Sequence, residues 1–246
     1  MSNSDDRPIP PLRWYTSAFE QLQNEHPLPQ PQSVREKTAF RFEKENIEAA
    51  LLLKLARYIS SLHAGQLLLA QGFLQELSTL QRTLDEIHED ILFLGMPFFG
   101  FSKTEDHQRY LQNFWANEPE FREFSGHQRN RWSIPRKTVR RYLSQVNPER
   151  ATDHSAIAVS AYLSRLYSGY LHAAAPQLLE LYDPKRRSFR LTGYPESSLL
   201  KDHRHDFDNQ FFRGVLCVSF VARILSADQL AAEAYEVHNR LEKHFH

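Results

Sequence analysis

The chain has 246 residues, and its 30 basic and 30 acidic side chains give a formal net charge of zero at pH 7. This balance excludes a protein that attracts nucleic acid over its whole surface, so any such binding must come from a local patch. The single cysteine, Cys217, excludes an internal disulfide and a four-cysteine zinc site.

Residues 1–33 are rich in proline and are expected to form an extended arm with one short helix, from about Arg13 to Glu25. The first residues are polar and acidic, and they lack the basic start and apolar core of a secretory signal. The longest apolar runs fall far short of the ~20 residues that a membrane-spanning helix needs. We therefore expect a cytoplasmic protein with no membrane partner.

Residues 34–246 are predicted to form one helical-bundle domain. A long helical hairpin is expected over 34–95, with a break at Gly72 and an end at Gly95 and Pro97. A basic and aromatic insert follows over 102–150, with helices over 102–117 and behind Pro135 and an irregular stretch between them. Three further helices are expected over 153–183, 197–226 and 227–245, with Ser226 or Asp228 as the cap between the last two. Residues 188–195, SFRLTGYP, are expected to form a loop that leaves room for a little extended structure. No convincing strand ladder is evident, so the fold class is all-α, a single bundle with a proline-rich N-terminal arm.

The stretch SRLYSGYLHAAAPQLLELYD, residues 164–183, carries polar side chains in an otherwise apolar segment. Arg165 and His172 are seven residues apart, which on a helix is about 700° of rotation, and Ser168 lies between them on the same stripe. An arginine can hold a phosphate and a histidine can transfer a proton, as metal-free RNA cleavage requires. In the structural alternative, Ser168 bonds to its own helix and His172 meets a carboxylate in the core.

A second polar set lies in the 34–95 hairpin. Arg82 and Glu86 are four residues apart, opposite a face of leucines and isoleucine, and Glu89 and Asp90 prolong the acidic side. Together with Glu48 they are candidates for a polar layer inside the bundle.

The segments LLLAQGFLQELSTLQRTLDEIHEDILFL and YSGYLHAAAP resemble a widespread bacterial family of uncharacterised helical proteins. Its pattern is a glycine that ends a first helix, Arg-x-x-x-Glu in a second and Ser-x-x-x-His in a later one. Here these positions are Gly72, Arg82 with Glu86, and Ser168 with His172. The resemblance covers about residues 40–185; it implies a helical fold and marks these polar positions.

The chain is also loosely similar to HEPN domains, helical bundles that often act as metal-independent ribonucleases in toxins and phage defence. Their signature is an arginine, four to six residues and then a histidine, usually in a dimer that brings two such pairs together. Arg165 and His172 have six residues between them, although Leu166 follows where a small polar residue is usual. Arg57 and His63 also match in spacing, but they fall on different faces of their helix. The likeness implies a homodimer that needs no cofactor.

Metal binding has one candidate segment. KDHRHDFDN places His203 and His205 among aspartates, where a divalent metal could bind, although acidic residues at a helix start commonly interact with the helix dipole instead. Ferritin-like bundles need Glu-x-x-His on two helices, and this sequence has no such motif. We predict no metal site.

Two basic clusters stand out against the zero net charge. The stretch 127–141 contains six cations and no acid, and its candidate RNA contacts are Arg129, Arg131, Arg136, Lys137, Arg140 and Arg141. The second, smaller cluster is KRRSFR, residues 185–190. Alternatively, the arginines of the first cluster cover apolar surface with their stems.

Two functional hypotheses follow. In the first, the protein is a HEPN-like effector that cleaves RNA without a metal, with Arg165 and His172 as the reacting pair, Ser168 in support, and Arg82 and Glu86 orienting them. In the second, it is a non-catalytic helical interaction protein in which the same residues form a buried polar network.

Overall fold

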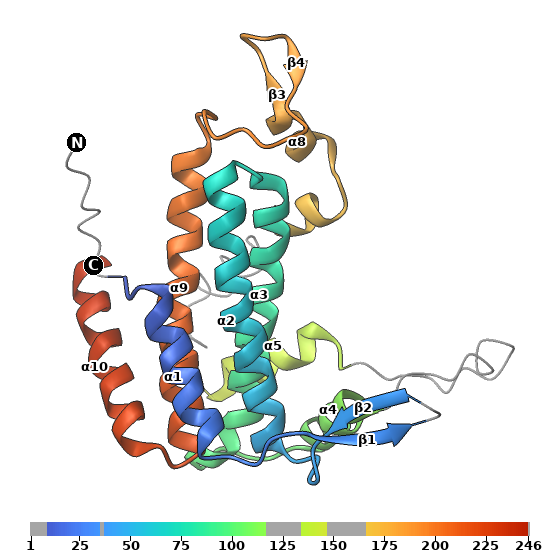
Figure 1. The fold of residues 1–246 in the computed structure, drawn as a ribbon, viewed down its shortest axis with the longest axis vertical. Coiled ribbons are helices and arrows are strands. Elements are labelled where there is room, and N and C mark those ends of the chain that lie inside the picture. The colour runs from blue at the N-terminus through green and yellow to red at the C-terminus, as the bar shows by residue number, and fades with distance from the viewer. Residues whose placement is uncertain (1–8, 35–36, 117–133, 147–165, 246) are drawn as a thin grey trace, which may run out of the picture.

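The computed structural model describes residues 9–34, 37–116, 134–146 and 166–245. Helices dominate these ranges, and the long ones lie side by side along the molecule (Figure 1). They are α1 (Leu12–Asn24), α2 (Ile47–Gln71), α3 (Leu74–Gly95), α9 (Leu200–Ile224) and α10 (Asp228–Phe245). Helix α9 contacts the other four, so it is the centre of the bundle. The expected helical fold is confirmed for these residues, and none of the described helices is long and apolar enough to cross a membrane.

One end of the bundle is closed by shorter helices. The 3-10 helix η1 (Met96–Phe99) ends α3, α4 (Glu105–Trp115) contacts α2, and α5 (Arg136–Val146) contacts α3. The expected helices over 102–117 and behind Pro135 are therefore present, whereas most of the irregular stretch between them lies outside the described residues.

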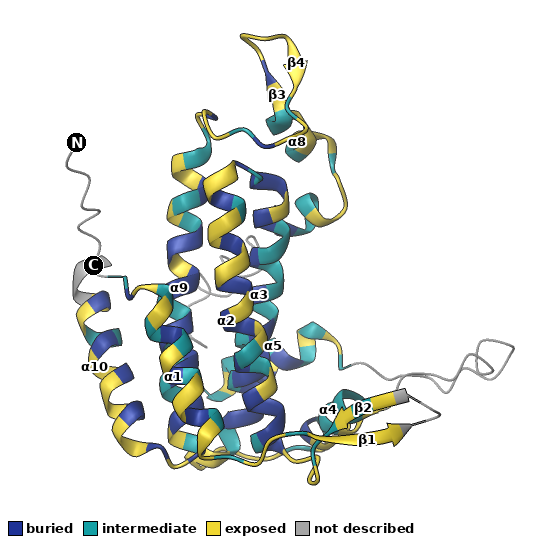
Figure 2. Cartoon of the chain, in the orientation of Figure 1, coloured by how far each residue is buried: buried dark blue, intermediate teal, exposed yellow. Residues whose placement is uncertain are grey.

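The core lies between α1, α2, α3, α9 and α10, whose inward faces are buried (Figure 2). Helix α1, expected as part of an arm, belongs to this core because Tyr15 is fully buried and its hydroxyl donates to the Phe211 carbonyl at 2.8 Å. The Tyr58 hydroxyl donates to the carbonyl of Gln210, the residue before Phe211 on α9, also at 2.8 Å. A Cβ on Gly214 would approach both tyrosine rings to 3.0–3.1 Å, so glycine gives the two rings room against α9.

The structure also contains two short antiparallel ribbons, although the sequence showed no convincing strand ladder. An antiparallel ribbon joins β1 (Gln30–Val34) to β2 (Lys37–Arg41), and a second joins β3 (Tyr182–Asp183) to β4 (Ser188–Phe189). Pro31 argued against a strand at this place in the sequence, because proline has no amide hydrogen to donate to a neighbouring strand. It is tolerated here because both strands of a two-stranded ribbon are edge strands.

A single helix over 153–183 was also wrong for the part that is described. The helix over 166–171 ends in a tight turn in which the Ala174 amide donates to the Gly169 carbonyl at 2.9 Å and Ala173 has a φ of 53°. Pro176 has no amide hydrogen to continue a helix across this turn. The chain then forms α8 (Ala175–Leu178) and the 3-10 helix η3 (Leu179–Leu181), which leads directly into β3.

Of the two helix boundaries predicted at single residues, one was correct. Gly72 caps α2 with a φ of 71°, as expected, and the Phe73 amide closes the turn on the Leu68 carbonyl at 2.9 Å. Between α9 and α10 the predicted cap was wrong. Ser226 has a left-handed φ of 62° and lies in the turn that closes α9, where the Ala227 amide donates to the Ala222 carbonyl at 2.9 Å, and Asp228 is already the first residue of α10.

Candidate functional site

Helix α3 carries four of the eleven buried polar residues in the described ranges, more than any other element there. One row faces α9 and the base of the β3–β4 hairpin, and another faces α2 and α5. We call the first row, with its partners, the α3–α9 seam and the second the ionic layer.

The α3–α9 seam consists of polar pairs that recur along both helices. Ser78 Oγ lies 3.1 Å from His203 Nδ1, Asp85 accepts from Gln210 Nε2 at 2.7 Å, and His88 Nδ1 lies 3.2 Å from Cys217 Sγ. Asp85 also pairs with Arg213. Because the residue numbers rise together on both helices, α3 and α9 run in the same direction. The pairs recur at separations of three and seven residues, which keeps them on one helix face.

At the hairpin end of the seam, His203 joins a larger group. Its Nε2 lies 3.4 Å from Glu180 Oε2, and Glu180 also accepts from the Tyr170 hydroxyl at 2.8 Å and from Gln75 Nε2 at 3.2 Å. Gln75 Nε2 donates in addition to the Gln177 carbonyl at 2.7 Å. This polar clasp ties α8 and η3 to the bundle. The order Ser78, His203, Glu180 has the composition of a serine–histidine–acid relay, but Ser78 is fully buried, so no substrate reaches its hydroxyl in this conformation.

Gln81 lies between the clasp and Asp85 on α3 and is fully buried. Neither of its amide atoms has a hydrogen-bond partner within the described ranges. A buried, unpaired amide costs about 1–3 kcal/mol, and methionine fills nearly the same volume without polar atoms.

We therefore expect Gln81→Met to stabilise the protein by about 1 kcal/mol, measured by urea unfolding. Gln210→Met, which removes an amide that does have a partner in Asp85, serves as the matched control and should destabilise. A loss of stability in Gln81→Met would show that the amide is satisfied in solution by ordered water.

The ionic layer joins three helices through α3 carboxylates. Asp90 accepts from Lys54 Nζ of α2 at 2.8 Å and from Arg136 Nη1 of α5 at 2.6 Å. Glu89 accepts from Arg140 Nε at 2.7 Å. The Lys54 and Asp90 side chains are only 10% and 5% exposed, and the Lys54 ammonium lies about 5 Å from the ring centroids of two aromatic residues, Tyr110 and Phe114.

Burial and charge pull the pKa values of this layer in opposite directions. Burial alone would raise the pKa of Asp90, but the Lys54 ammonium and the Arg136 guanidinium together hold it below its ordinary value. Burial lowers the pKa of Lys54, and Asp90 opposes that shift. Burial raises the pKa of Glu89 and of Asp85 despite their arginine partners. Asp90 is therefore fully paired, whereas ionised Glu89 is under-compensated.

This difference predicts a pH dependence for Glu89→Gln. A carboxyl whose folded-state pKa is raised loses stability as the pH rises from the unfolded pKa through the folded one. Glutamine imitates the protonated form, so the variant should be more stable than wild type at pH 7, and the gain should shrink towards pH 4. Urea unfolding at both pH values measures it, with Glu105→Gln on the exposed side of α4 as the control. A variant that is destabilised at pH 7 would contradict the expected sign.

Of the predicted catalytic residues Arg165, Ser168 and His172, only the last two lie within the described ranges. Arg165 lies outside the described residues, Ser168 is half-buried on the helix over 166–171, and His172 follows the last residue of that helix and is exposed. Arg82 pairs with Glu86 at 3.2 Å, as the spacing predicted, and Glu86 also lies 3.7 Å from Arg136. The polar layer expected around Glu86, Glu89 and Asp90 therefore exists.

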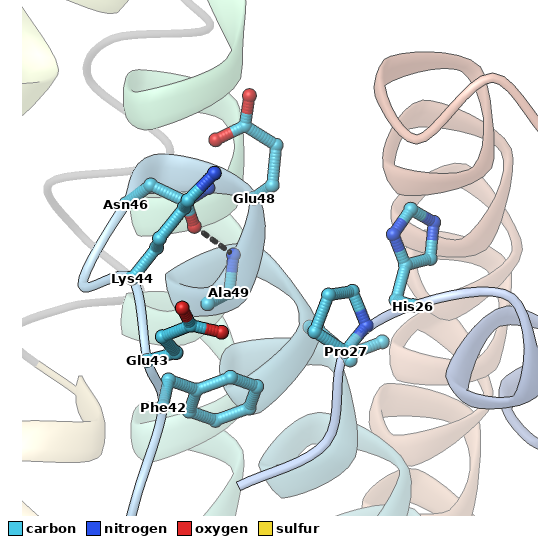
Figure 3. A pocket seen from close by; sticks show the side chains of 9 residues that line it. His26, Pro27, Phe42, Glu43, Lys44, Asn46, Glu48 and Ala49 are labelled. Carbon is cyan, nitrogen blue, oxygen red and sulfur yellow. Dashed lines mark hydrogen bonds between the residues drawn. The ribbon is translucent and has the colours of Figure 1, made fainter.

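Glu48 belongs elsewhere. It borders a pocket of about 270 Å³ at the N-terminus of α2, where Asn46 Oδ1 accepts from the Ala49 amide at 2.9 Å (Figure 3). Lys54, nearly two turns further along α2, reaches the ionic layer instead. The pocket contains none of the predicted catalytic or RNA-binding residues; its lining consists of His26, Pro27, Phe42, Glu43, Lys44, Asn46, Glu48, Ala49 and Leu52.

The predicted RNA-binding stretch divides in two. Arg129 and Arg131 lie outside the described residues, and Arg136 and Arg140 pair with the α3 carboxylates. Only two of its described cations, Lys137 and Arg141, are exposed on α5. For the suggested metal segment, His203 belongs to the polar clasp and His205 is exposed, and the described ranges contain no group of three or more metal-ligating side chains.

Sequence reasoning missed Lys54, Asp85, Tyr170 and Glu180. For Lys54 and Asp85 a signal was present, because each is a charge within a leucine-rich helical run and Asp85 follows Ser78 by seven residues. For Glu180 no local signal exists, since its partners come from α3, α9 and the helix over 166–171.

Comparison with known proteins adds no relative: no family model, no curated protein and no solved structure matches this chain.

Proposed function

We propose that this protein is a helical interaction protein in which the buried polar residues hold the helices in register. The observation that supports this is the ionic layer: its members are bonded to one another across α2, α3 and α5, with Asp90 as the shared acceptor. Buried groups that satisfy one another stabilise one helix arrangement and are not free to act on a substrate.

The interaction would take place at the hairpin end of the molecule. Fourteen large apolar side chains are exposed in the described ranges, and six of them fall between residues 171 and 191. We call these six the hairpin surface; they are Leu171, Leu178, Leu179, Tyr182, Phe189 and Leu191. Exposed apolar side chains gathered in one region commonly mark a binding site.

This proposal is tested first by removing apolar groups from the hairpin surface. The double variant Phe189→Ser with Leu191→Ser should melt within about 2 °C of wild type, because side chains that are already exposed contribute little to folding. Leu77→Ser, in the core, is the control and should melt far lower. A large fall in the double variant would mean that the hairpin surface is covered within the folded chain, and the proposal would be wrong.

RNA cleavage is the second candidate, and one observation favours it. His172 is exposed, and the next residue, Ala173, has a φ of 53°, a strained conformation for a residue other than glycine. Such strain is often found at functional sites. An exposed imidazole beside this turn could act as a general acid or base in a HEPN-like dimer.

A single assay separates the two candidates. Labelled transfer RNA and single-stranded RNA are incubated without metal, with wild type, His172→Ala and Arg165→Ala, all checked for helicity. The interaction proposal expects the same intact RNA with all three proteins. Cleavage by wild type that is lost in both variants would favour the ribonuclease.

A further inference from the structure

The β3–β4 hairpin is a defined structure that projects from the end of the bundle (Figure 1). Tyr182 pairs with Phe189 and Asp183 with Ser188 across its two strands. The Asp183 carboxylate accepts from the amides of Lys185 and Arg186 at 2.9 and 3.2 Å, which shapes the turn at the tip. The backbone of the tip is therefore held in a defined turn.

The tip is cationic. Lys185, Arg186 and Arg187 are consecutive and exposed, and Arg187 has a φ of 51°, a conformation that glycine or asparagine would adopt more easily. Arg186 lies 3.7 Å from Asp183, while neither Lys185 nor Arg187 has an ion-pair partner in the described part of the chain. Behind the tip, the half-buried Arg190 lies 3.9 Å from Asp183 and 3.8 Å from Glu196. Two cations of the tip are thus unpaired.

Two aromatic rings lie directly behind these cations. The rings of Tyr182 and Phe189 contact each other edge to face, with centroids 5.4 Å apart, and their residues are 37% and 54% exposed. Because side chains alternate along a strand, this cross-strand pair shares one face of the hairpin, while Asp183 and Ser188 point to the other. The hairpin thus combines exposed rings and unpaired cations within eight residues.

The ionic layer explains why this hairpin, rather than α5, is the better anion-binding surface. Arg136 and Arg140 of α5 are neutralised by Asp90 and Glu89. A phosphate would have to compete with these carboxylates for the same guanidinium groups. Among the described residues, no carboxylate competes with a phosphate for Lys185 or Arg187.

We propose that the β3–β4 hairpin binds single-stranded RNA, with phosphates on the tip cations and bases stacked on Tyr182 and Phe189. Backbone neutralisation combined with aromatic stacking is the general mode of single-strand binding. This inference rests on the proposed interaction function and names its partner. A lipid bilayer fits less well, because the cations form the outermost turn and the apolar side chains lie behind them. Insertion of the apolar groups would drive the charged tip deeper than the headgroups.

The test is fluorescence anisotropy with the full chain and a 5′-labelled, 20-nucleotide RNA of mixed sequence. Two phosphate contacts on a single strand, at Lys185 and Arg187, should make binding about sevenfold weaker at 200 mM salt than at 50 mM. Lys185→Gln with Arg187→Gln should weaken binding about tenfold and flatten this salt dependence. Tyr182→Leu with Phe189→Leu keeps the apolar volume but loses stacking, and should also cost about tenfold at unchanged salt dependence.

The matched control is Lys137→Gln with Arg141→Gln, which removes the two exposed cations of α5 and should change affinity less than twofold. The inference is overturned if wild type binds no RNA at 50 mM salt, or if the control loses affinity while the hairpin variants keep it. It is also overturned if wild type instead binds phosphatidylcholine vesicles containing one quarter phosphatidylserine. Such a failure with an unchanged melting temperature in the Phe189→Ser, Leu191→Ser variant would leave the interaction proposal standing and exclude only RNA as its partner.

Discussion

Replacing Asp90 with alanine is expected to destabilise the protein by about 3 kcal/mol and to lower its melting temperature by roughly 6–12 °C. Asp90 accepts from Lys54 at 2.8 Å and from Arg136 at 2.6 Å, and its own side chain is 5% exposed. Without the carboxylate, two cations face each other in a partly desolvated site. Most of this cost comes from the Lys54 ammonium, because its side chain is only 10% exposed and cannot reach water, whereas the Arg136 side chain is 31% exposed.

The measurement is urea unfolding at pH 7, with two comparison variants. Arg109→Ala removes an exposed pair with Glu105 on α4, formed at 3.1 Å, and should cost no more than about 0.5 kcal/mol. Lys54→Met keeps the apolar contacts of the lysine stem and leaves Asp90 bonded to Arg136, so it should cost less than Asp90→Ala. If Asp90→Ala were as mild as Arg109→Ala, the ionic layer would not stabilise the bundle.

The same variants also predict how the stability difference between wild type and Asp90→Ala changes at acidic pH. Since the pKa of Asp90 is lowered in the folded protein, its contribution is present above the unfolded value and is lost as the pH falls through the folded one. Wild type and Asp90→Ala should therefore converge in stability at strongly acidic pH.

The second large effect is expected for Gly72→Ala, at about 3–4 kcal/mol. Gly72 has a φ of 71°, and an added Cβ would lie 2.3 Å from the Tyr194 carbonyl carbon and from the Pro195 nitrogen. These are backbone atoms and cannot rotate away. The Tyr194 amide also donates to the Gly72 carbonyl at 2.9 Å, so the contact joins the α2–α3 turn to the loop between the hairpin and α9.

Gly100→Ala separates the two causes of that loss. Gly100 has a φ of 86°, yet a Cβ there would meet nothing within 4 Å. Its substitution should cost only the left-handed strain, about 1–2 kcal/mol. Thermal unfolding of both variants gives the difference, which measures the backbone clash alone. Equal losses would mean that the loop at Tyr194 yields to the new methyl group.

The sequence predicted the C-terminal ends of the long helices well, because helix stops are local signals. The start of the helical hairpin, predicted at residue 34, was wrong, because β2 occupies Lys37–Arg41 and α2 begins only at Ile47. Gly72 ends α2 and Gly95 ends α3 where expected, and the last two helices fall within their predicted ranges. The helix predicted over 153–183 fails for its described part since apolar periodicity continues through Ala173–Ala175, although the backbone turns there. The pairing of the two ribbons was missed because strands of two to five residues carry little periodicity, although β4 lies in the loop where a little extended structure was allowed.

For the candidate site, the sequence by itself determined which α3 residues were polar and that Arg82 and Glu86 would meet, since a separation of four residues on one helix suffices for that contact. Only the tertiary structure decided what lies opposite them. Asp90 meets Lys54 and Arg136 across 36 and 46 residues of chain, and Glu180 meets Gln75 across 105. Likewise, α5 has the composition of an RNA-binding stretch, but in the structure two of its arginines are paired with carboxylates of α3. Local spacing determines which side chains share a helix face, whereas helix packing determines which charges are neutralised and which, as at the hairpin tip, remain unpaired.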